Sequence, residues 1–288
     1  MSEVWGFGIV RSNESPSSLG RDQSPFEELC SLASAASGLR LEPVVVASYA
    51  ELTASILSGE VGLAWLPPVP TIDLESRGTA AVLAIPARGG STTYHAAFIV
   101  RRGGPKTLAE LRGRRAAWVQ RDSAAGYLVP RMHLAAQGFD VLRFFARELF
   151  VHSHAGVIDV VLSGEADVGA TFCTVDPSTG KVLRSGWQDE RGQSIRPIEA
   201  LATMGPIPND ALVAATDLPA NARLALTRWL LTIDGRAKEI FESMLGAGDF
   251  RVPAANHYEM LRHALRAAHA RGHDALPPSS RMRMRVGR

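Results

Sequence analysis

Short apolar runs alternate with amphipathic segments along most of the chain. Strand-length apolar runs lie at 5–11, 41–47, 61–66, 80–86, 94–101 and 115–119. Residues 25–37 have the apolar spacing of a helix, with Ser24 and Glu27 in a capping-box pattern at its start and Gly38 placed to end it. Strands that alternate with helices favour an α/β fold with largely parallel sheets.

One strand–helix–strand unit occurs twice. Residues 48–60 read SYAELTASILSGE and residues 153–165 read SHAGVIDVVLSGE, with six of thirteen positions identical. A serine opens each helix, an apolar run precedes it and another follows it. Glu51 is expected to complete a capping box with Ser48. A repeated unit of this kind predicts two similar α/β lobes.

Turn signals and hydrophobic period assign the remaining segments. A loop at 120–126 leads into a helix that is expected to end at Gly138. We further expect a strand at 142–151, a polar surface excursion at 174–197, strands at 199–205 and 211–217, and mainly helix from 219 to about 271.

Composition fits a globular protein of two domains. The chain has 288 residues, about the length at which single cores give way to two, and 46% of the residues are hydrophobic. A net charge of +2 gives no reason to expect nucleic acid as a partner, and no apolar run reaches the roughly 20 residues of a membrane-inserted helix. The basic tail RMRMRVGR is interpreted as a solvated terminus.

Neither cysteines nor the N-terminus indicate an exported protein. Cys30 and Cys173 have no metal or redox spacing, and we expect both to be buried. MSEVWGFGIVRS leads directly into a strand, without a basic start, a long apolar core or a cleavage site. The sequence as written therefore predicts a cytoplasmic protein, and a periplasmic one if its start is truncated.

Five segments, in order, carry a resemblance to a known family. They read YHAAFIVRR, TLAELRGRRAAWV, DSAAGYLVPRMHLAAQGFD, FVHSHAGVIDVVLSGEADVGA and GPIPNDALVAATDLP. From about Ser48 to Leu231 the chain resembles the phosphonate and phosphite substrate-binding proteins of ABC importers. The resemblance implies the type 2 periplasmic binding-protein fold, in which two α/β lobes are joined by two crossing segments and hold a ligand in the cleft between them.

The resemblance also implies boundaries and ligand contacts. The first lobe would comprise residues 1–92 and 204–288 and the second residues 93–203, with crossings near 90–94 and 203–209. The family's ligand-binding positions carry over to Tyr49, Tyr94, Ser123 and His154, and to the loop residues Ala124 and Ala125.

Elementary chemistry supports an anion site at these positions. Ser48, Ser123 and Ser153 each open a helix directly after a strand, where free amides and the helix dipole favour negative charge. His154 is expected to titrate near neutral pH and to bind an oxyanion. The plainer alternative also stays open, because such serines can merely cap their helices and a tyrosine or a lone histidine can be structural.

The loop departs from the family at two positions. Where that family typically has serine, threonine, serine and glycine, this chain has Ser123, Ala124, Ala125 and Gly126. Two hydroxyl donors are therefore missing, and an unmade hydrogen bond to a buried charged oxygen costs about 1–3 kcal/mol. Carboxylates, sulfonates and larger phosphorylated compounds thus join phosphonate and phosphite as candidate ligands.

Other chemistry is sparsely represented. Asp210, in the PIPND turn, is a candidate to meet an amine of the ligand. His152 and His154 have the spacing of two ligands on one strand face but lack a recognisable third, so we expect no metal and no cofactor.

Two functional classes remain open from the sequence. The first is a binding protein for a small anionic ligand, which would either deliver it to an ABC transporter permease or act as a cytoplasmic sensor. The second is a cytoplasmic enzyme on the same fold, as in the chorismate-dehydratase-like proteins. The sequence shows no paired acid and base and no activated nucleophile, so no catalytic residue is assigned and binding is favoured.

Overall fold

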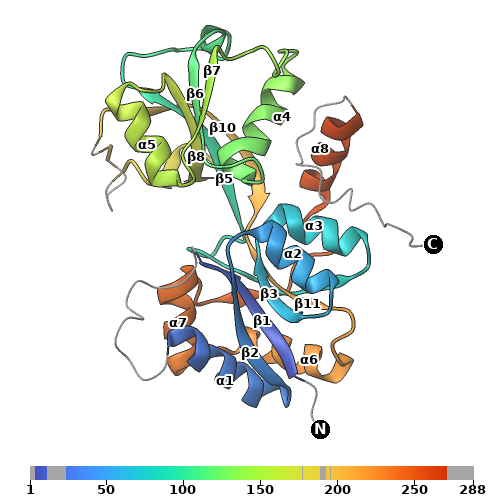
Figure 1. Ribbon diagram of the computed structural model, residues 1–288. Coiled ribbons are helices and arrows are strands. Elements are labelled where there is room, and N and C mark those ends of the chain that lie inside the picture. The colour runs from blue at the N-terminus through green and yellow to red at the C-terminus, as the bar shows by residue number, and fades with distance from the viewer. Residues whose placement is uncertain (1–3, 12–23, 177, 189–192, 195, 271–288) are drawn as a thin grey trace, which may run out of the picture. The chain divides into compact units, whose positions relative to one another are not determined.

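The chain is seen in a computed structural model, which describes residues 4–11, 24–176, 178–188, 193–194 and 196–270. These residues divide into two compact units (Figure 1). Unit 1 consists of the residues up to Thr93 together with Pro208–Glu259, and unit 2 of Tyr94–Ile207 together with the residues from Met260 on. The last boundary falls at the start of helix α8 (Glu259–Ala270), whereas the sequence analysis placed all of 204–288 in the first lobe.

Unit 1 is built on a six-stranded mixed sheet with the order β12-β4-β11-β3-β1-β2. The strands β1, β2 and β3 are parallel, whereas β11 runs antiparallel to β3 and β4. Their bounds are β1 (Val4–Val10), β2 (Arg40–Val46), β3 (Val61–Leu66), β4 (Ala80–Pro86), β11 (Ala211–Ala215) and β12 (Phe250–Arg251).

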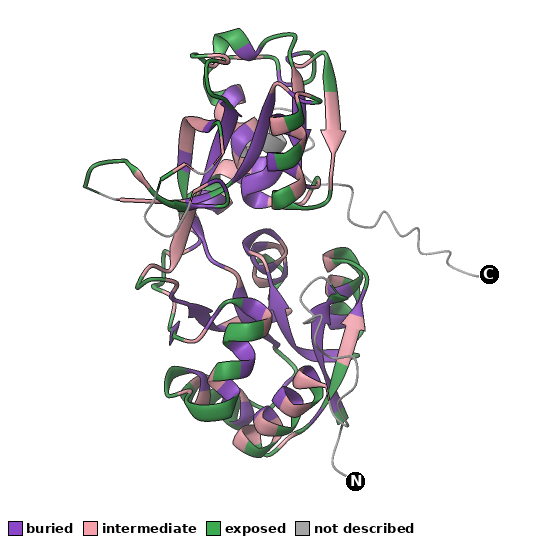
Figure 2. Cartoon of the chain, turned by 90° about the vertical axis from the view of Figure 1, so that its left-hand side faces the viewer, coloured by how far each residue is buried: buried purple, intermediate pink, exposed green. Residues whose placement is uncertain are grey.

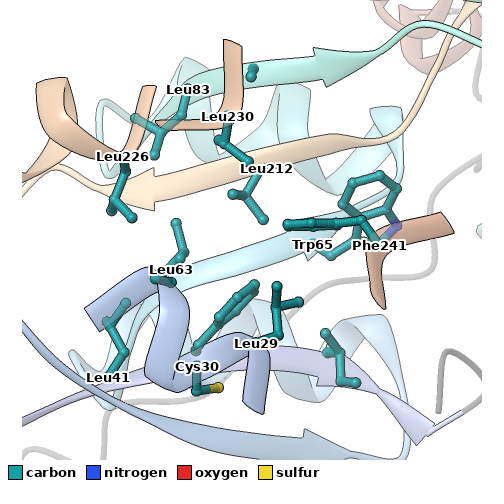
Figure 3. Close-up of a cluster of buried hydrophobic side chains, with 14 of the residues drawn as sticks. Leu29, Cys30, Leu41, Leu63, Trp65, Leu83, Leu212, Leu226, Leu230 and Phe241 are labelled. Carbon is teal, nitrogen blue, oxygen red and sulfur yellow. The ribbon is translucent and has the colours of Figure 1, made fainter. Parts of the chain in front are cut away.

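Helices cover both faces of this sheet. They are α1 (Pro25–Ser37), α6 (Ala220–Leu231) and α7 (Gly235–Leu245) on one side, and α2 (Tyr49–Leu57) and α3 (Pro68–Ser76) on the other (Figure 1). The main core lies between the sheet and α1, α6 and α7. There Trp65 packs against Phe241, and Leu29 and Cys30 of α1 lie near Leu63 (Figure 3).

Unit 2 is likewise built on a six-stranded sheet with helices on both faces. Its sheet has the order β10-β5-β8-β6-β7, with β9 paired to β8. The strands are β5 (Thr93–Arg101), β6 (Arg115–Trp118), β7 (Arg147–Phe150), β8 (Val168–Val175), β9 (Val182–Ser185) and β10 (Ile198–Pro208). Helices α4 (Val129–Ala136) and α5 (His154–Ser163) cover opposite faces of the sheet, and the central strands are mainly buried (Figures 1 and 2).

The chain passes between the units at β5, at β10 and at the start of α8, and β5 and β10 are neighbours in one sheet. On the unit 1 side, the buried residue Asn209 holds the passages at β5 and β10 together. Its Nδ2 donates to the carbonyls of Pro86 and Ser91 at 2.9 and 3.1 Å, and its backbone N–H donates to Thr92 at 3.0 Å. The side chain and backbone of Asn209 thus join the segment that follows β10 to the segment that leads into β5.

Several local expectations are confirmed. Helix α1 has the predicted bounds, and Ser24 and Glu27 form the predicted capping box. The two serine caps of the repeated unit have nearly the same backbone geometry, with φ and ψ of −149° and 158° at Ser48 and −151° and 152° at Ser153. Both cysteines are buried, as expected, and burial raises the pKa of each thiol to about 12.

Other local expectations are wrong. Glu51 does not close a capping box, because its carboxylate accepts from the N–H of Ala47 rather than that of Ser48. Only residues 147–150 of the predicted strand 142–151 are strand, since Phe144 turns inward to pack against Phe139 and Phe145. The polar excursion contains β9.

Candidate functional site

Three strands of unit 2 end at one edge of its sheet. The strands β6, β7 and β8 are mutually parallel, so the loops that follow β6 and β7 leave from the same edge. Two further hydrogen bonds hold these loops together beyond the strands, from the N–H of Val151 to Trp118 O at 3.0 Å and from that of His152 to Val119 O at 2.9 Å. In α/β sheets, ligands bind outside the carboxyl ends of strands.

The loop after β6 enters a helix through one π-helical turn, η4 (Ala124–Leu128), that continues into α4. The Ser123 hydroxyl accepts from the N–H of Gly126 at 3.0 Å, and the N–H of Leu128 bonds back to Ser123 O at 3.0 Å. Pro130 explains the wide turn, because it has no N–H for Gly126 O and its ring crowds that carbonyl. Gly126 O instead accepts from Val119 N–H at 3.2 Å.

This turn presents backbone donors only. The first amides of a helix have no partner within it, and those of Ala124 and Ala125 open η4 at the edge of the sheet. Both residues are buried, at 4% and 2% exposure, and their methyl side chains have no donor. Hydrogen bonds from these two positions to a ligand must therefore come from the main chain.

The helix after β7 differs from its copy in unit 1 where an anion would bind. Ser153 caps α5 by accepting from the N–H of Gly156 at 3.0 Å. In α2, Ser48 accepts from Glu51, so Glu51 occupies the position equivalent to Gly156. The Glu51 carboxylate places negative charge at the start of α2, where it already interacts with the dipole. The start of α5 has no acidic residue in its first turn, so it is the better anion site of the two.

His154 extends from the start of α5 to β8. Its Nδ1 lies 3.0 Å from Oγ1 of Thr171, and its ring meets the Phe172 ring edge-on with centroids 4.8 Å apart. Desolvation lowers the pKa of His154 to about 4, so the ring is neutral near pH 7. Thr171 is buried, and its hydroxyl proton is satisfied if it donates to Nδ1. That arrangement favours the tautomer with its proton on Nε2, which is a donor.

The same loop carries a cation and a carboxyl group. The Arg121 guanidinium lies 4.8 Å from the centre of the Phe150 ring and donates to the Tyr127 hydroxyl at 3.2 Å. Burial raises the pKa of Asp122, while hydrogen bonds to its own backbone and to Gln120 oppose that shift. Two ionisable groups therefore lie next to Ser123 in the sequence. They are the exposed guanidinium of Arg121 and the carboxyl group of Asp122, which loses its proton less readily than an ordinary aspartate.

The structure brings the candidate residues of unit 2 to one edge. Ser123, Ala124, Ala125 and His154 lie there, and so does Tyr94, because the register pairs the next residue, His95, with Cys173 near the end of β8. Thr171 and Phe172 were missed from the sequence. Of these two, only Thr171 could have been noticed in the sequence, because it is a polar residue inside the mainly apolar run ADVGATF.

Tyr49 and Asp210 belong to unit 1. Tyr49 is the first residue of α2, after the carboxyl end of β2, and is half-buried. Asp210 immediately precedes β11, whose first residue pairs with Leu66 at the carboxyl end of β3. Burial raises the pKa of Asp210, and Arg88, 3.5 Å away, opposes the shift. Asp210 therefore already has a cationic partner within unit 1.

Metal chemistry gains no support from the part of the chain that is described, which contains no group of three His, Cys, Asp or Glu side chains suited to hold an ion. His154 is engaged by Thr171, and His152 has a left-handed backbone with a φ of 61°. Such a conformation is uncommon for a residue other than glycine and costs about 1–3 kcal/mol. The turn before α5 is thus held in a strained form beside the candidate site. None of the described helices is long and apolar enough to span a membrane.

Two α/β units, with helix starts at the carboxyl edges of their sheets, have the type 2 periplasmic binding-protein fold. The sequence profile of the ABC transporter, phosphonate, periplasmic substrate-binding proteins matches residues 9–258. The chain belongs to this family.

Solved structures share the fold at low sequence identity. XAC2383 from Xanthomonas citri, bound to ATP, has a TM-score of 0.74 and 23% identity, covering 94% of this chain and 99% of its own. A binding component of an ABC phosphonate transporter from Pseudomonas aeruginosa has a TM-score of 0.70 and 18% identity, and the match covers 96% of this chain and 90% of that protein. PhnD1 from Prochlorococcus marinus, in complex with methylphosphonate, has a TM-score of 0.69 and 17% identity, and the match covers 92% of this chain and 98% of that protein. These findings support a binding protein and give no support to the enzyme alternative.

Proposed function

We propose that the protein binds a small oxyanion of the phosphonate class at the carboxyl edge of the unit 2 sheet. The observation that carries this proposal is the convergence there of two helix starts without an acidic first-turn residue and of His154. The ligand's oxygens accept from main-chain amides at Ala124 and Ala125, from the start of α5 and from Nε2 of a neutral His154.

Two tyrosines are also proposed as ligand contacts. Tyr49 in unit 1 and Tyr94 in unit 2 are each assigned as a hydroxyl donor and an aromatic surface. Asp210 contacts an amine of the ligand only if that amine displaces or joins Arg88, its present partner. We therefore propose that Asp210 contributes less to ligand binding than the other proposed residues.

The chemistry of structurally similar proteins supports an oxyanion without fixing which one. The Prochlorococcus protein was solved with methylphosphonate, the Xanthomonas protein with ATP, and a further neighbour from Escherichia coli is described as an aliphatic sulphonate binding protein. A tetrahedral oxyanion is common to these compounds. The loss of two hydroxyl groups at Ala124 and Ala125 favours a ligand that needs fewer donors than phosphate itself.

The family description supports a proposal for the partner and the location of the protein. We propose that the protein delivers its ligand to the permease of an ABC importer in the periplasm, as the family description implies. The alternative is that the protein acts as a cytoplasmic sensor, a role that requires no permease. Co-purification with a membrane permease expressed alongside the protein distinguishes the two roles.

A panel of anions tests the proposed ligand class. Phosphate, phosphite, methylphosphonate, methanesulfonate and acetate are compared by thermal shift and calorimetry, with chloride as the control salt. A ligand at 100 times its Kd is expected to stabilise the fold by about 2.7 kcal/mol. His154→Gln should weaken binding of whichever oxyanion is active. If no tetrahedral oxyanion raises the melting temperature of the wild-type protein, the proposal is wrong.

A further inference from the structure

Strand β8 exposes a large apolar ring beside the proposed oxyanion site. Phe172 is 43% exposed, although its neighbours Thr171 and Cys173 are 1% and 0% exposed. The strand is interior to the sheet, between β5 and β6, where side chains are usually covered. An exposed phenyl ring in such a strand calls for a specific explanation.

The register explains why the ring is uncovered. Beyond Gly169, β8 has no further pairing with β6, so Thr171 and Phe172 lie just past the end of that strand. On its other side Phe172 faces Ala96 of β5, whose single methyl covers little of a phenyl ring. Side chains alternate along a strand, so Thr171 lies on the α5 side of the sheet together with Gly169.

Phe172 is nevertheless part of the site. Its ring packs edge-on against His154, which is hydrogen-bonded to the preceding residue Thr171. The π-helical turn η4 also contacts β8, so the loop that begins at Ser123 lies against the same strand. The exposed ring is therefore adjacent to a donor side chain and close to a turn that supplies main-chain amides.

From this juxtaposition we propose that Phe172 forms an apolar subsite, and that the ligand is an oxyanion carried on an aromatic or bulky apolar group. This inference rests on the proposed function and narrows its ligand class. The oxyanion binds the amides and His154, while the apolar group covers the Phe172 ring. Offset or edge-on contact between aromatic rings adds to the gain from removing both surfaces from water.

The ligand class also accounts for the two alanines in the loop. A phosphonate monoester has two charged oxygens, and an aryl phosphonate lacks the fourth oxygen of inorganic phosphate, so each needs fewer hydrogen-bond partners. The same site binds inorganic phosphate poorly, because it offers an apolar ring where a fourth polar oxygen would need a partner.

Calorimetry with two matched ligands tests the inference. Phenylphosphonate and methylphosphonate share the oxyanion and differ in the group that meets Phe172. We expect the wild-type protein to bind phenylphosphonate about tenfold more tightly. Phe172→Ala should abolish this preference, because it lowers the affinity for phenylphosphonate more than the affinity for methylphosphonate. Phe172→Trp should retain it. Leu142→Ala removes another exposed apolar side chain of unit 2, at 70% exposure, and should change neither value.

Each outcome decides a separate point. Binding of methylphosphonate with no preference for phenylphosphonate, or a preference that survives Phe172→Ala, overturns the apolar subsite and leaves the proposed function standing. Failure of both ligands, and of the wider anion panel, overturns the function together with the subsite. Equal losses for both ligands in Phe172→Ala, with the Trp variant also impaired, would assign the ring a structural role and contradict the inference.

Discussion

The contact between His154 and Thr171 determines which form of the imidazole a ligand meets. From the sequence, His154 was expected to titrate near neutral pH, and this expectation is wrong for the ligand-free protein because burial lowers its pKa to about 4. A neutral ring can still donate to an oxyanion, provided the proton resides on Nε2. The hydroxyl of Thr171 favours that tautomer by occupying Nδ1.

Removing the Thr171 hydroxyl tests this positioning. Thr171→Val keeps the side-chain shape and leaves Nδ1 without its partner, so both tautomers become accessible. Affinity for methylphosphonate should fall about three- to tenfold, which corresponds to the net value of about one hydrogen bond. Thr171→Ser should keep most of the affinity. Nitrogen-15 chemical shifts of the His154 ring report the tautomer directly, and an unchanged tautomer in the valine variant would contradict the assignment.

The lowered pKa of His154 also makes stability depend on pH. The unfolded chain binds a proton at this residue below about pH 6.5, whereas the folded protein does so only below about pH 4. Stability is therefore fully present above pH 6.5 and is lost as the pH falls from 6.5 toward 4. Because the ring is partly exposed, we expect a loss of about 1–2 kcal/mol at pH 5.

Urea denaturation of the wild-type protein and His154→Gln at pH 7.5 and pH 5 measures this loss. The wild-type protein should lose more stability than the variant by that amount. The pKa values of His95, His133 and His257 are lowered by the same cause, but these residues are present in both proteins and cancel in the comparison. Arg121 and Asp122 lie on the neighbouring loop and likewise remain unchanged. Equal losses in both proteins would contradict the shift.

At the level of helices and strands, local signals predicted those elements whose caps and periodicity agree. Helix α1 is one example, with its serine cap, Glu27 and terminal glycine all in place. The π-helical turn at Ser123 was not predictable in the same way. It depends on Pro130 and on a hydrogen bond from Val119, eleven residues earlier, and propensity rules do not describe such a combination.

The π-helical turn depends on a glycine. A Cβ on Gly126 would lie 2.4 Å from Cγ2 of Val119 and 2.8 Å from Oγ of Ser123. Gly126→Ala should therefore destabilise the protein by about 1–3 kcal/mol and weaken methylphosphonate binding, since the clash displaces the amides at the start of η4. Gly186→Ala is the control, because its one close neighbour is the flexible end of Ile158. Denaturation and calorimetry of both variants give the comparison, and equal effects would argue against a specific role for the turn.

For the molecule as a whole, the sequence and its family resemblance predicted the two-lobed α/β class correctly. The repeated unit was informative because both copies keep the serine cap and the strand after it. Thr171 and Phe172 were beyond reach, since their proximity to His154 depends on the register of β8 against β5 and β6. A single sequence does not specify register between strands that lie more than 50 residues apart.

The chain passages at β5 and β10 depend on Asn209 within unit 1. Asn209→Ala removes two side-chain hydrogen bonds and leaves the carbonyls of Pro86 and Ser91 without those donors in a buried region. We expect a loss of about 2–4 kcal/mol in the free energy of unfolding, near the sum of two such penalties. Asn221→Ala, an exposed asparagine on α6, should change it by less than about 0.5 kcal/mol. A similar small change at both positions would show that the passages are held in another way.

The two buried cysteines allow the opening rate of each unit to be measured separately. Cys30 lies in α1 of unit 1 and Cys173 in β8 of unit 2, and with a pKa of about 12 each thiol is both inaccessible and protonated at pH 8. A thiol reagent can reach either sulfur only when the surrounding structure opens. Labelling rates read by mass spectrometry therefore report the opening of each unit separately, in one unmodified protein. A ligand bound chiefly through unit 2 would slow the reaction of Cys173 more than that of Cys30.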